Sequence, residues 1–274
     1  MKQAEISLQE LLEAGVHFGH QPQRWCPRMK PYLYGKREGV HIFDLIKTKK
    51  MLEEACDFVS KSVAAGKVII FVGTKRQAAP IIVEEAKRAD VPYVSQRWLG
   101  GSVTNWEQIK RSIDKLAKMK SEKEAGDYGK FTKKENLLID REIARLEKFF
   151  GGLSALKKNP DILFIVDIKR EEAAVKEAKK KEIPIVAIVD SNSDPRPIDY
   201  VIPANDDAVR SVKLIVTLIA DAVIEGRRIS EKKSETTDGS LKAKKGSASV
   251  KSSVSKKTAK KPASGSKKKT KKAS

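Results

Sequence analysis

The feature that most constrains the fold of this chain is a repeated alternation of short apolar runs with amphipathic helical patterns. The runs are continuously apolar, which is typical of strands buried on both faces of a parallel sheet. They lie at 67–73, 91–94, 162–166, 183–189 and 200–202. Helical patterns occur at 44–65, 75–89 and 171–181, and a final helix is expected at 206–225. Strands connected by helices predict right-handed crossovers and an α/β fold, a parallel sheet flanked by helices.

The N-terminal segment, residues 1–39, has a different character. The sequence Ser7-Leu8-Gln9-Glu10 has capping-box spacing, and Gly15 suits a helix end, so one short helix is expected there. Residues 16–39 are rich in His, Pro, Arg, Trp, Tyr and Lys without a sustained period. This composition predicts a loop segment that is ordered by itself or by a partner, ahead of a sheet domain formed by 40–104 and 151–230.

Residues 105–150 interrupt the α/β rhythm and predict an inserted antiparallel coiled-coil hairpin. Its two narrow apolar stripes, at spacings of three and four, consist of Trp106, Ile109, Ile113 and Leu116, then Ile139, Ile143, Leu146 and Phe150. Arms of this length should project from the sheet domain. The glycine pairs Gly100-Gly101 and Gly151-Gly152 flank the hairpin like hinges.

Charge indicates the class of partner. The chain has 56 Lys and Arg against 36 Asp and Glu. Residues 231–274 contain 15 Lys, 3 acidic residues and no aromatic residue, which predicts a disordered tail that adds salt-sensitive attraction to phosphates. A basic chain of this kind most often has nucleic acid as its partner.

Membrane and secreted proteins are disfavoured. The first ten residues lack the apolar run of a signal peptide, and the most apolar stretch, 214–224, is shorter than the roughly 20 residues that span a bilayer. Two cysteines, Cys26 and Cys56, form no disulfide framework and favour a reducing compartment. We therefore expect a cytoplasmic protein without membrane contact.

Three clusters of residues are candidates for RNA binding, because they combine cations, aromatic rings and close-approach glycines. The first is His17, His20, Arg24, Trp25, Arg28, Lys30 and Tyr32; the second is Thr74, Lys75 and Arg76; the third is Arg97, Trp98, Gly100, Gly101, Thr104 and Asn105. The second cluster follows a buried strand where a helix begins, a place that suits a phosphate.

Each cluster also has a structural interpretation. The first is equally consistent with a loop that packs its aromatic rings onto the body, and the second with an ordinary strand-to-helix turn. In the third, Trp98 and Trp106 can anchor the base of the hairpin. The chain contains neither G-x-G-x-x-G nor G-x-x-x-x-G-K-[ST], so no standard nucleotide motif supports a nucleotide-binding turn.

Metal and catalytic sites are not predicted. His17, His20, Asp190, Asp194, Asp206 and Asp207 lie in segments that can converge at one sheet edge, but their spacing is not a ligand motif. We expect no cofactor, although a metal shared by His20, Asp190 and Asp206 stays an open question. No signature of nucleophilic or acid–base catalysis occurs, so we expect no enzyme. The remaining alternatives are a nucleotide-using α/β enzyme and a DNA-binding protein driven by the tail.

The same residues resemble a known family. The segments LLEAGVHFGH (11–20), WCPRMKPY (25–32), FVGTKR (71–76), RWLGG with TNW (97–101, 104–106) and IVDSNSDP (188–195) are closely similar, in this order, to the family of the second protein of the bacterial small ribosomal subunit. The resemblance covers about residues 5–228, and the Lys-rich tail departs from the usual pattern.

This resemblance implies a Rossmann- or flavodoxin-like sheet with an inserted coiled-coil hairpin and no catalytic activity. It also implies a structural role in the small ribosomal subunit, with small-subunit rRNA and neighbouring ribosomal proteins as partners and no small-molecule substrate. One implied role is to help dock the large mRNA-binding ribosomal protein.

Overall fold

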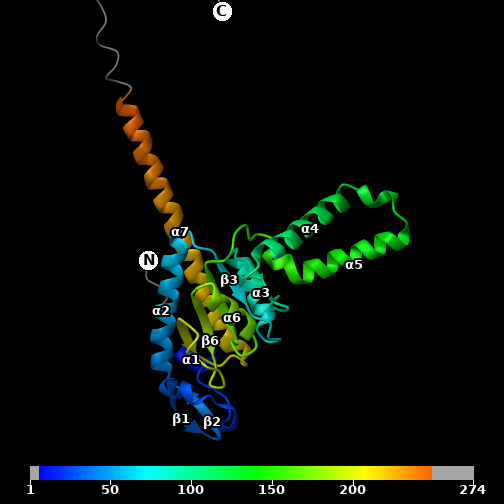
Figure 1. The fold of residues 1–274 in the computed structure, drawn as a ribbon. Coiled ribbons are helices and arrows are strands. Elements are labelled where there is room, and N and C mark those ends of the chain that lie inside the picture. Colours follow the sequence, from blue (N-terminus) through cyan, green and yellow to red (C-terminus); the bar gives the residue numbers. More distant parts are fainter. Residues whose placement is uncertain (1–5, 249–274) are drawn as a thin grey trace, which may run out of the picture. The chain divides into compact units, whose positions relative to one another are not determined.

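A computed structural model describes residues 6–248, with side chains as far as residue 232 (Figure 1). The chain divides into two compact units, the first of which ends at Glu231. The contacts described below belong to this first unit. None of the described helices is long and apolar enough to cross a membrane.

The centre of the first unit is a five-stranded sheet. Its strands are β3 (Ile69–Val72), β4 (Tyr93–Val94), β5 (Ile162–Val166), β6 (Ile185–Val189) and β7 (Tyr200–Pro203). They lie in the order β4-β3-β5-β6-β7, and every neighbouring pair is parallel. This order is the flavodoxin-like doubly wound one, in which the connections reverse direction beside the first strand. The predicted fold class is therefore confirmed.

Helices cover both faces of the sheet because successive side chains of each strand point to opposite faces. Ile69 and Phe71 of β3 belong to a core cluster with α2 (Leu45–Ala64), α3 (Ala79–Arg88) and α7 (Val209–Ala248). Ile70 and Val72 belong to a second cluster with α6 (Glu172–Lys180) and the base of the helical hairpin. The continuous apolar runs in the sequence are thus explained by burial on two sides.

The hairpin consists of α4 (Trp106–Glu124) and α5 (Lys133–Phe150), joined through a short 3-10 helix, η3 (Asp127–Lys130). Figure 1 shows it extending away from the sheet. Its buried residues are those that the spacing predicted: Ile109, Ile113 and Leu116 on one arm, Ile143, Leu146 and Phe150 on the other. Ion pairs cross between the arms, with Lys115 3.1 Å from Glu142 and Lys123 2.7 Å from Asp140.

The N-terminal segment contains more regular structure than the sequence predicted. After α1 (Leu8–Glu13) come the 3-10 helices η1 (Pro22–Arg24) and η2 (Pro27–Tyr32), then strands β1 (Leu33–Arg37) and β2 (Val40–Phe43). The two strands form an antiparallel hairpin whose turn, Glu38-Gly39, has φ values of 51° and 79°. The predicted domain boundary between residues 39 and 40 falls inside this turn, so it separates two paired strands.

The last helix is longer than expected. Its predicted end was residue 225, but α7 continues to Ala248. Once a helix exists, each added residue avoids the cost of nucleation, so a polar segment can extend it. The stretch expected to be disordered is therefore helical over 231–248, and its remainder, 249–274, lies outside the described residues.

Candidate nucleic-acid interface

The first two predicted clusters, and Arg97 of the third, lie at the edge of the sheet formed by the carboxyl ends of its strands. Residues 74–76 follow β3, Arg97 follows β4, Asp167 follows β5, and the segment after β6 begins with Asp190. Because all five strands are parallel, these positions lie along one edge, which we call the carboxyl edge. Convergence at one edge was expected for the segments that carry His20, Asp190, Asp206 and Asp207, and the structure brings these segments together.

The first cluster packs against the carboxyl edge through Ser191. The backbone N–H of Cys26 donates to the Ser191 carbonyl at 2.7 Å, and the backbone N–H of His20 donates to Ser191 Oγ at 2.7 Å. A Cβ on Gly19 would lie 2.8 Å from Ser191 Oγ, so only glycine allows this approach. Arg28 adds an ion pair to Asp194 at 2.6 Å. The segment predicted to face RNA is therefore held beside the strand ends.

Lys75 makes internal contacts that the sequence did not predict. Its ammonium lies 2.7 Å from Asp206, 2.6 Å from Asp207 and 3.6 Å from Asp167, and its side chain is only 13% exposed. Burial alone would lower the pKa of Lys75, but hydrogen bonds to Asp206 and Asp207 outweigh it and raise the pKa. Lys75, the cation predicted to bind a phosphate, therefore forms ion pairs with carboxylates of the chain itself.

Thr74 is likewise satisfied from within the chain. Its backbone N–H donates to Glu171 at 3.1 Å, its hydroxyl donates to the same carboxylate, and Arg170 Nε donates to the Thr74 hydroxyl at 2.9 Å. Burial raises the pKa of Glu171. The two Thr74 donors, which a phosphate at this turn could use, are therefore occupied by a carboxylate of the chain.

His20 is the centre of a second polar group. Its Nδ1 lies 3.0 Å from Asp190 and its Nε2 lies 3.4 Å from Asp207. The hydrogen bond with Asp190 raises the pKa of His20. Ligand atoms of these three residues lie within 4.8 Å of one another, so they can offer nitrogen and oxygen ligands to a metal ion.

Asp206 lies beside this group, with its backbone N–H 3.3 Å from Asp190 Oδ2. Burial, followed by the charges of Asp190 and Asp167, raises the pKa of Asp206 to about 7. Its Oδ2 has no hydrogen-bond partner among the described residues. His17 lies apart from the group, against the ring of Phe18, and burial lowers its pKa.

The third cluster forms the base of the helical hairpin. Glu177 of α6 accepts hydrogen bonds from the backbone N–H groups of Gly101 (2.8 Å), Val103 and Thr104 (both 3.2 Å), from Thr104 Oγ1 (3.0 Å) and from Trp98 Nε1 (3.1 Å). These bonds outweigh the effect of burial and lower the pKa of Glu177. Trp98 is buried, which supports its interpretation as an anchor of the hairpin.

Two of the four glycines beside the hairpin have a clear structural role. Gly101 has φ +93°, a conformation that side chains rarely adopt. A Cβ on Gly152 would clash with the Tyr93 carbonyl oxygen, so this glycine allows a close packing contact. Gly100 has open space around it, and the role of the two pairs as hinges stays a prediction.

Several predicted cations remain available at the surface. Arg24, Lys30, Arg76 and Arg97 are exposed, and none has an ion-pair partner within the described part of the chain. The exposed cations Lys169 and Arg170 follow β5 at the same edge. These two cations were not predicted, because no glycine or aromatic residue marks that turn.

The other predicted residues lie near these cations. Trp25 packs against His41 with ring centroids 4.8 Å apart, and Tyr32 is half-buried against the second core cluster. Gly100 and Asn105 are exposed in the segment before α4.

An open apolar groove lies beside β1 and β2. It has a volume of about 580 Å³ and is lined by Leu12, His17, Phe18, Tyr34, Val40 and Ile42, with Lys36, Arg37 and Glu38 at polar positions. Leu12, Phe18 and Tyr34 are among the exposed large apolar residues of the described chain. Exposed apolar surface of this kind marks interaction sites.

Comparison with known proteins agrees with the sequence motifs. The family described as ribosomal protein S2 matches residues 11–226. The small ribosomal subunit protein uS2 of Dictyoglomus thermophilum is 53% identical over 232 residues, which cover 85% of this chain and 94% of that protein. The uS2 proteins of Picosynechococcus sp. and Petrotoga mobilis are 50% and 53% identical, over 81% of this chain and 87% and 77% of their own lengths. With a family match over most of its length, this chain belongs to the ribosomal protein S2 family, a family of structural ribosomal proteins and not of enzymes.

Proposed function

We propose that this structural ribosomal protein binds small-subunit rRNA along the carboxyl edge of its sheet and contacts neighbouring ribosomal proteins, including the large mRNA-binding one. Its place would be the small subunit of the ribosome in the cytoplasm. The proposal rests on the fold, on the charges at this edge and on family membership.

The observation that carries the proposal is the set of exposed cations without internal partners at one edge. Arg24, Lys30, Arg76 and Arg97 come from three separate segments and are brought to the carboxyl edge, where Lys169 and Arg170 add charge. Arginine and lysine contacts to phosphate supply most of the affinity in protein–nucleic acid complexes. The part of Trp25 that is not packed offers a stacking face next to them.

The other predicted residues would act as the support of this surface. His20, Arg28, Thr74 and Lys75 are tied to carboxylates of the chain, and Trp98, Gly101 and Thr104 are tied to Glu177. Gly100 and Asn105 are exposed and can approach a sugar or phosphate closely. His17 and Tyr32 would shape the boundary of the surface.

The apolar groove beside β1 and β2 would receive a protein partner. It combines Leu12, Phe18 and Tyr34 with the cations Lys36 and Arg37. A segment with apolar anchors and acidic flanks fits this chemistry, because interfaces pair apolar cores with complementary charges at their rims. We assign this groove to the large mRNA-binding ribosomal protein.

The test compares two full-length variants with the same loss of charge. Lys30→Gln, Arg76→Gln and Arg97→Gln are combined in one, and Lys50→Gln, Lys61→Gln and Lys213→Gln, exposed on α2 and α7, are combined in the control. Binding to small-subunit rRNA is measured over a series of salt concentrations. At about 0.7 per contact, loss of three phosphate contacts should lower the salt slope by about 2 and weaken binding at least about tenfold.

The control should stay within about twofold of the unchanged chain. If both triple variants bind rRNA equally well and co-sediment equally with the small subunit, the carboxyl edge is not the rRNA surface. Lys75 is left unchanged in both variants, because its ion pairs support the fold.

A further inference from the structure

A second group of exposed cations lies at the opposite edge of the sheet, formed by the amino ends of the strands. Lys67 precedes β3, Lys157 lies in the segment before β5, Lys180 is the last residue of α6, and Lys181 follows it ahead of β6. All four side chains are exposed, and none has an ion-pair partner within the described residues. We call this set the amino-edge lysines.

Backbone contacts show that the three segments are neighbours. The Asp161 N–H donates to the Val68 carbonyl at 2.8 Å, and the Leu163 N–H donates to the Pro184 carbonyl at 3.1 Å. The strands that follow, β3, β5 and β6, are adjacent in the sheet. Because adjacent strands lie about 4.8 Å apart, the starts of these three strands span only about 10 Å.

The carboxylates of this edge offset the charge of the amino-edge lysines only in part, through the attraction between Asp161 and Lys67. Asp161 accepts the Val68 N–H at 2.8 Å and pairs with Lys158 at 2.7 Å. Asp199 accepts the Ile185 N–H at 2.9 Å and pairs with Lys179 at 3.0 Å. Each acid thus accepts a backbone hydrogen bond at the start of a strand and forms an ion pair with a lysine outside the amino-edge set.

Three further acidic residues lie near this edge. Asp90 pairs with Arg227 at 3.1 Å, Glu182 is exposed, and Glu231 lines the same cavity as Lys67. Together with Lys158, Lys179 and Arg227, the four amino-edge lysines make seven cations against five carboxylates, so the surface keeps a net positive charge, which attracts a polyanion.

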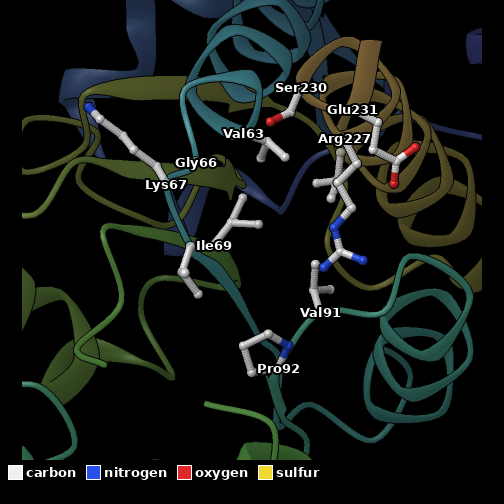
Figure 2. A pocket seen from close by; sticks show the side chains of 11 residues that line it. Val63, Gly66, Lys67, Ile69, Val91, Pro92, Arg227, Ser230 and Glu231 are labelled. Carbon is white, nitrogen blue, oxygen red and sulfur yellow. The ribbon is translucent and has the colours of Figure 1, made fainter. Parts of the chain in front are cut away.

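The neighbouring cavity does not account for these charges. Figure 2 shows a cavity of about 310 Å³ between Lys67 and Arg227, with apolar walls that include Val63, Ile69 and Val91. The Lys67 side chain extends away from the cavity, and Arg227 is already paired with Asp90. Lys67 is one of the residues that line this cavity, but its ammonium points outward, so the charge of the four lysines lies at the outer surface.

The chemistry of the surface favours a phosphate backbone over a protein partner. Protein interfaces are enriched in aromatic residues and depleted of lysine at their cores. None of the exposed large apolar side chains of the described chain comes from these three segments. Lysine is a compact point charge that suits sequence-independent contact with phosphate oxygens.

We propose that the amino-edge lysines form a second phosphate-binding surface, which holds a segment of the rRNA backbone on the side of the sheet opposite the carboxyl edge. This inference rests on the proposed function. The sheet then separates two segments of the rRNA, one bound at the carboxyl edge and one bound by the amino-edge lysines. The contact is expected to be independent of base sequence and to weaken as salt rises.

The test uses the full-length chain with Lys67→Gln, Lys157→Gln, Lys180→Gln and Lys181→Gln combined. A matched control combines Lys50→Gln, Lys61→Gln, Lys176→Gln and Lys213→Gln, four exposed lysines that each have a nearby acid. Both variants lose the same charge, and circular dichroism checks that both are folded. Binding to small-subunit rRNA is measured against salt, and backbone protection of the rRNA is mapped with hydroxyl radicals.

We expect the amino-edge variant to bind at least about tenfold more weakly with a salt slope lower by about 2, as roughly three lost contacts require. It should lose one protected segment and keep the segment that depends on Arg76 and Arg97. The control should stay within about twofold of the unchanged chain.

Other outcomes separate this inference from the proposed function. If the amino-edge variant equals its control while the Lys30, Arg76 and Arg97 variant is impaired, the inference is wrong and the proposed function stands. If the amino-edge variant keeps rRNA binding but loses a neighbouring ribosomal protein, the surface serves an acidic protein and the inference is wrong. If the unchanged chain does not bind the rRNA, the proposed function fails together with the inference.

Discussion

At the scale of single residues, Glu177 shows how much can depend on one carboxylate. It satisfies donors of four residues at the base of the helical hairpin, although it lies on α6 and is more than 70 positions away in sequence. Hydrogen bonds to a charged acceptor contribute more than neutral ones. We therefore expect the attachment of the hairpin to depend on its charge.

Replacing Glu177 with Gln should lower the free energy of unfolding by about 2 kcal/mol at neutral pH, since a neutral amide with one acceptor oxygen cannot serve all these donors. Urea denaturation measures the effect. Glu172→Gln, at an exposed position of the same helix, is the control and should change stability by less than about 0.5 kcal/mol. Equal effects of the two changes would contradict the role assigned to Glu177.

The same substitution should change the pH dependence of stability. Because the folded-state pKa of Glu177 is lowered below its ordinary value of 4.5, its contribution is present above about pH 4.5 and is lost as the pH falls through the lower folded-state pKa. The unchanged chain should therefore lose stability below pH 4.5 more steeply than the Glu177→Gln variant. If the free energy of unfolding of the two proteins fell equally with pH in this range, the charge of Glu177 would not contribute to stability.

The roles of the individual site residues were predicted least well from the sequence. The turn after β3 was located correctly, and its donors point to an anion as expected. The anion is supplied by Glu171 for Thr74 and by Asp206 and Asp207 for Lys75, residues about 100 or more positions away. Only the folded sheet brings these carboxylates to the turn, so no local pattern could reveal them.

At the scale of elements, the base of the helical hairpin is packed closely at one of its glycines. Gly152 lies against the backbone of Tyr93 in the edge strand β4, while Gly129 near the hairpin tip has open space around it. A glycine can serve flexibility or close approach, and its sequence context does not distinguish the two.

Gly152→Ala should destabilise the chain by about 3 kcal/mol, because the new Cβ must displace a backbone atom in a packed region. Gly129→Ala should be neutral within about 0.5 kcal/mol. Thermal unfolding of both variants measures the difference. If Gly152→Ala were as stable as Gly129→Ala, the two chain segments would not be in the close contact seen here.

The elements with strong apolar periodicity were predicted well, and weakly patterned ones were missed. The five sheet strands and the coiled-coil stripes follow from burial, which imposes their spacing. Strand β1 was missed because its residues Tyr34 to Arg37 are exposed, so no apolar pattern marks them. The extension of α7 was missed because its sequence beyond residue 231 is polar and resembles that of a disordered segment.

At the scale of the whole molecule, the body and the tail should contribute unequally to function. The packing of α7 against the sheet uses Val212, Val216, Ile219 and Val223, all of which precede Ser230. The segment from residue 231 onward contributes 15 Lys of the chain's total.

A chain that ends at Ser230 should therefore fold, co-sediment with the small ribosomal subunit, and bind rRNA more weakly with a reduced salt slope. Sedimentation of the full-length and shortened proteins at two salt concentrations checks this. Loss of the shortened chain from small-subunit fractions at both concentrations would make the tail the principal binding element.

The pairing of Thr74 and Lys75 with carboxylates of the chain affects whether the turn after β3 can bind free nucleotides in a cell. Flavodoxin-like sheets ordinarily offer their ligand crevice at the carboxyl ends of the strands, where phosphates gather. Here Glu171 accepts the Thr74 donors, and Asp206 and Asp207 pair with Lys75, so a triphosphate that entered this turn would first have to displace three carboxylates of the chain. We therefore expect free nucleotides such as ATP to compete weakly for this turn, although the sheet has an order that often binds nucleotides.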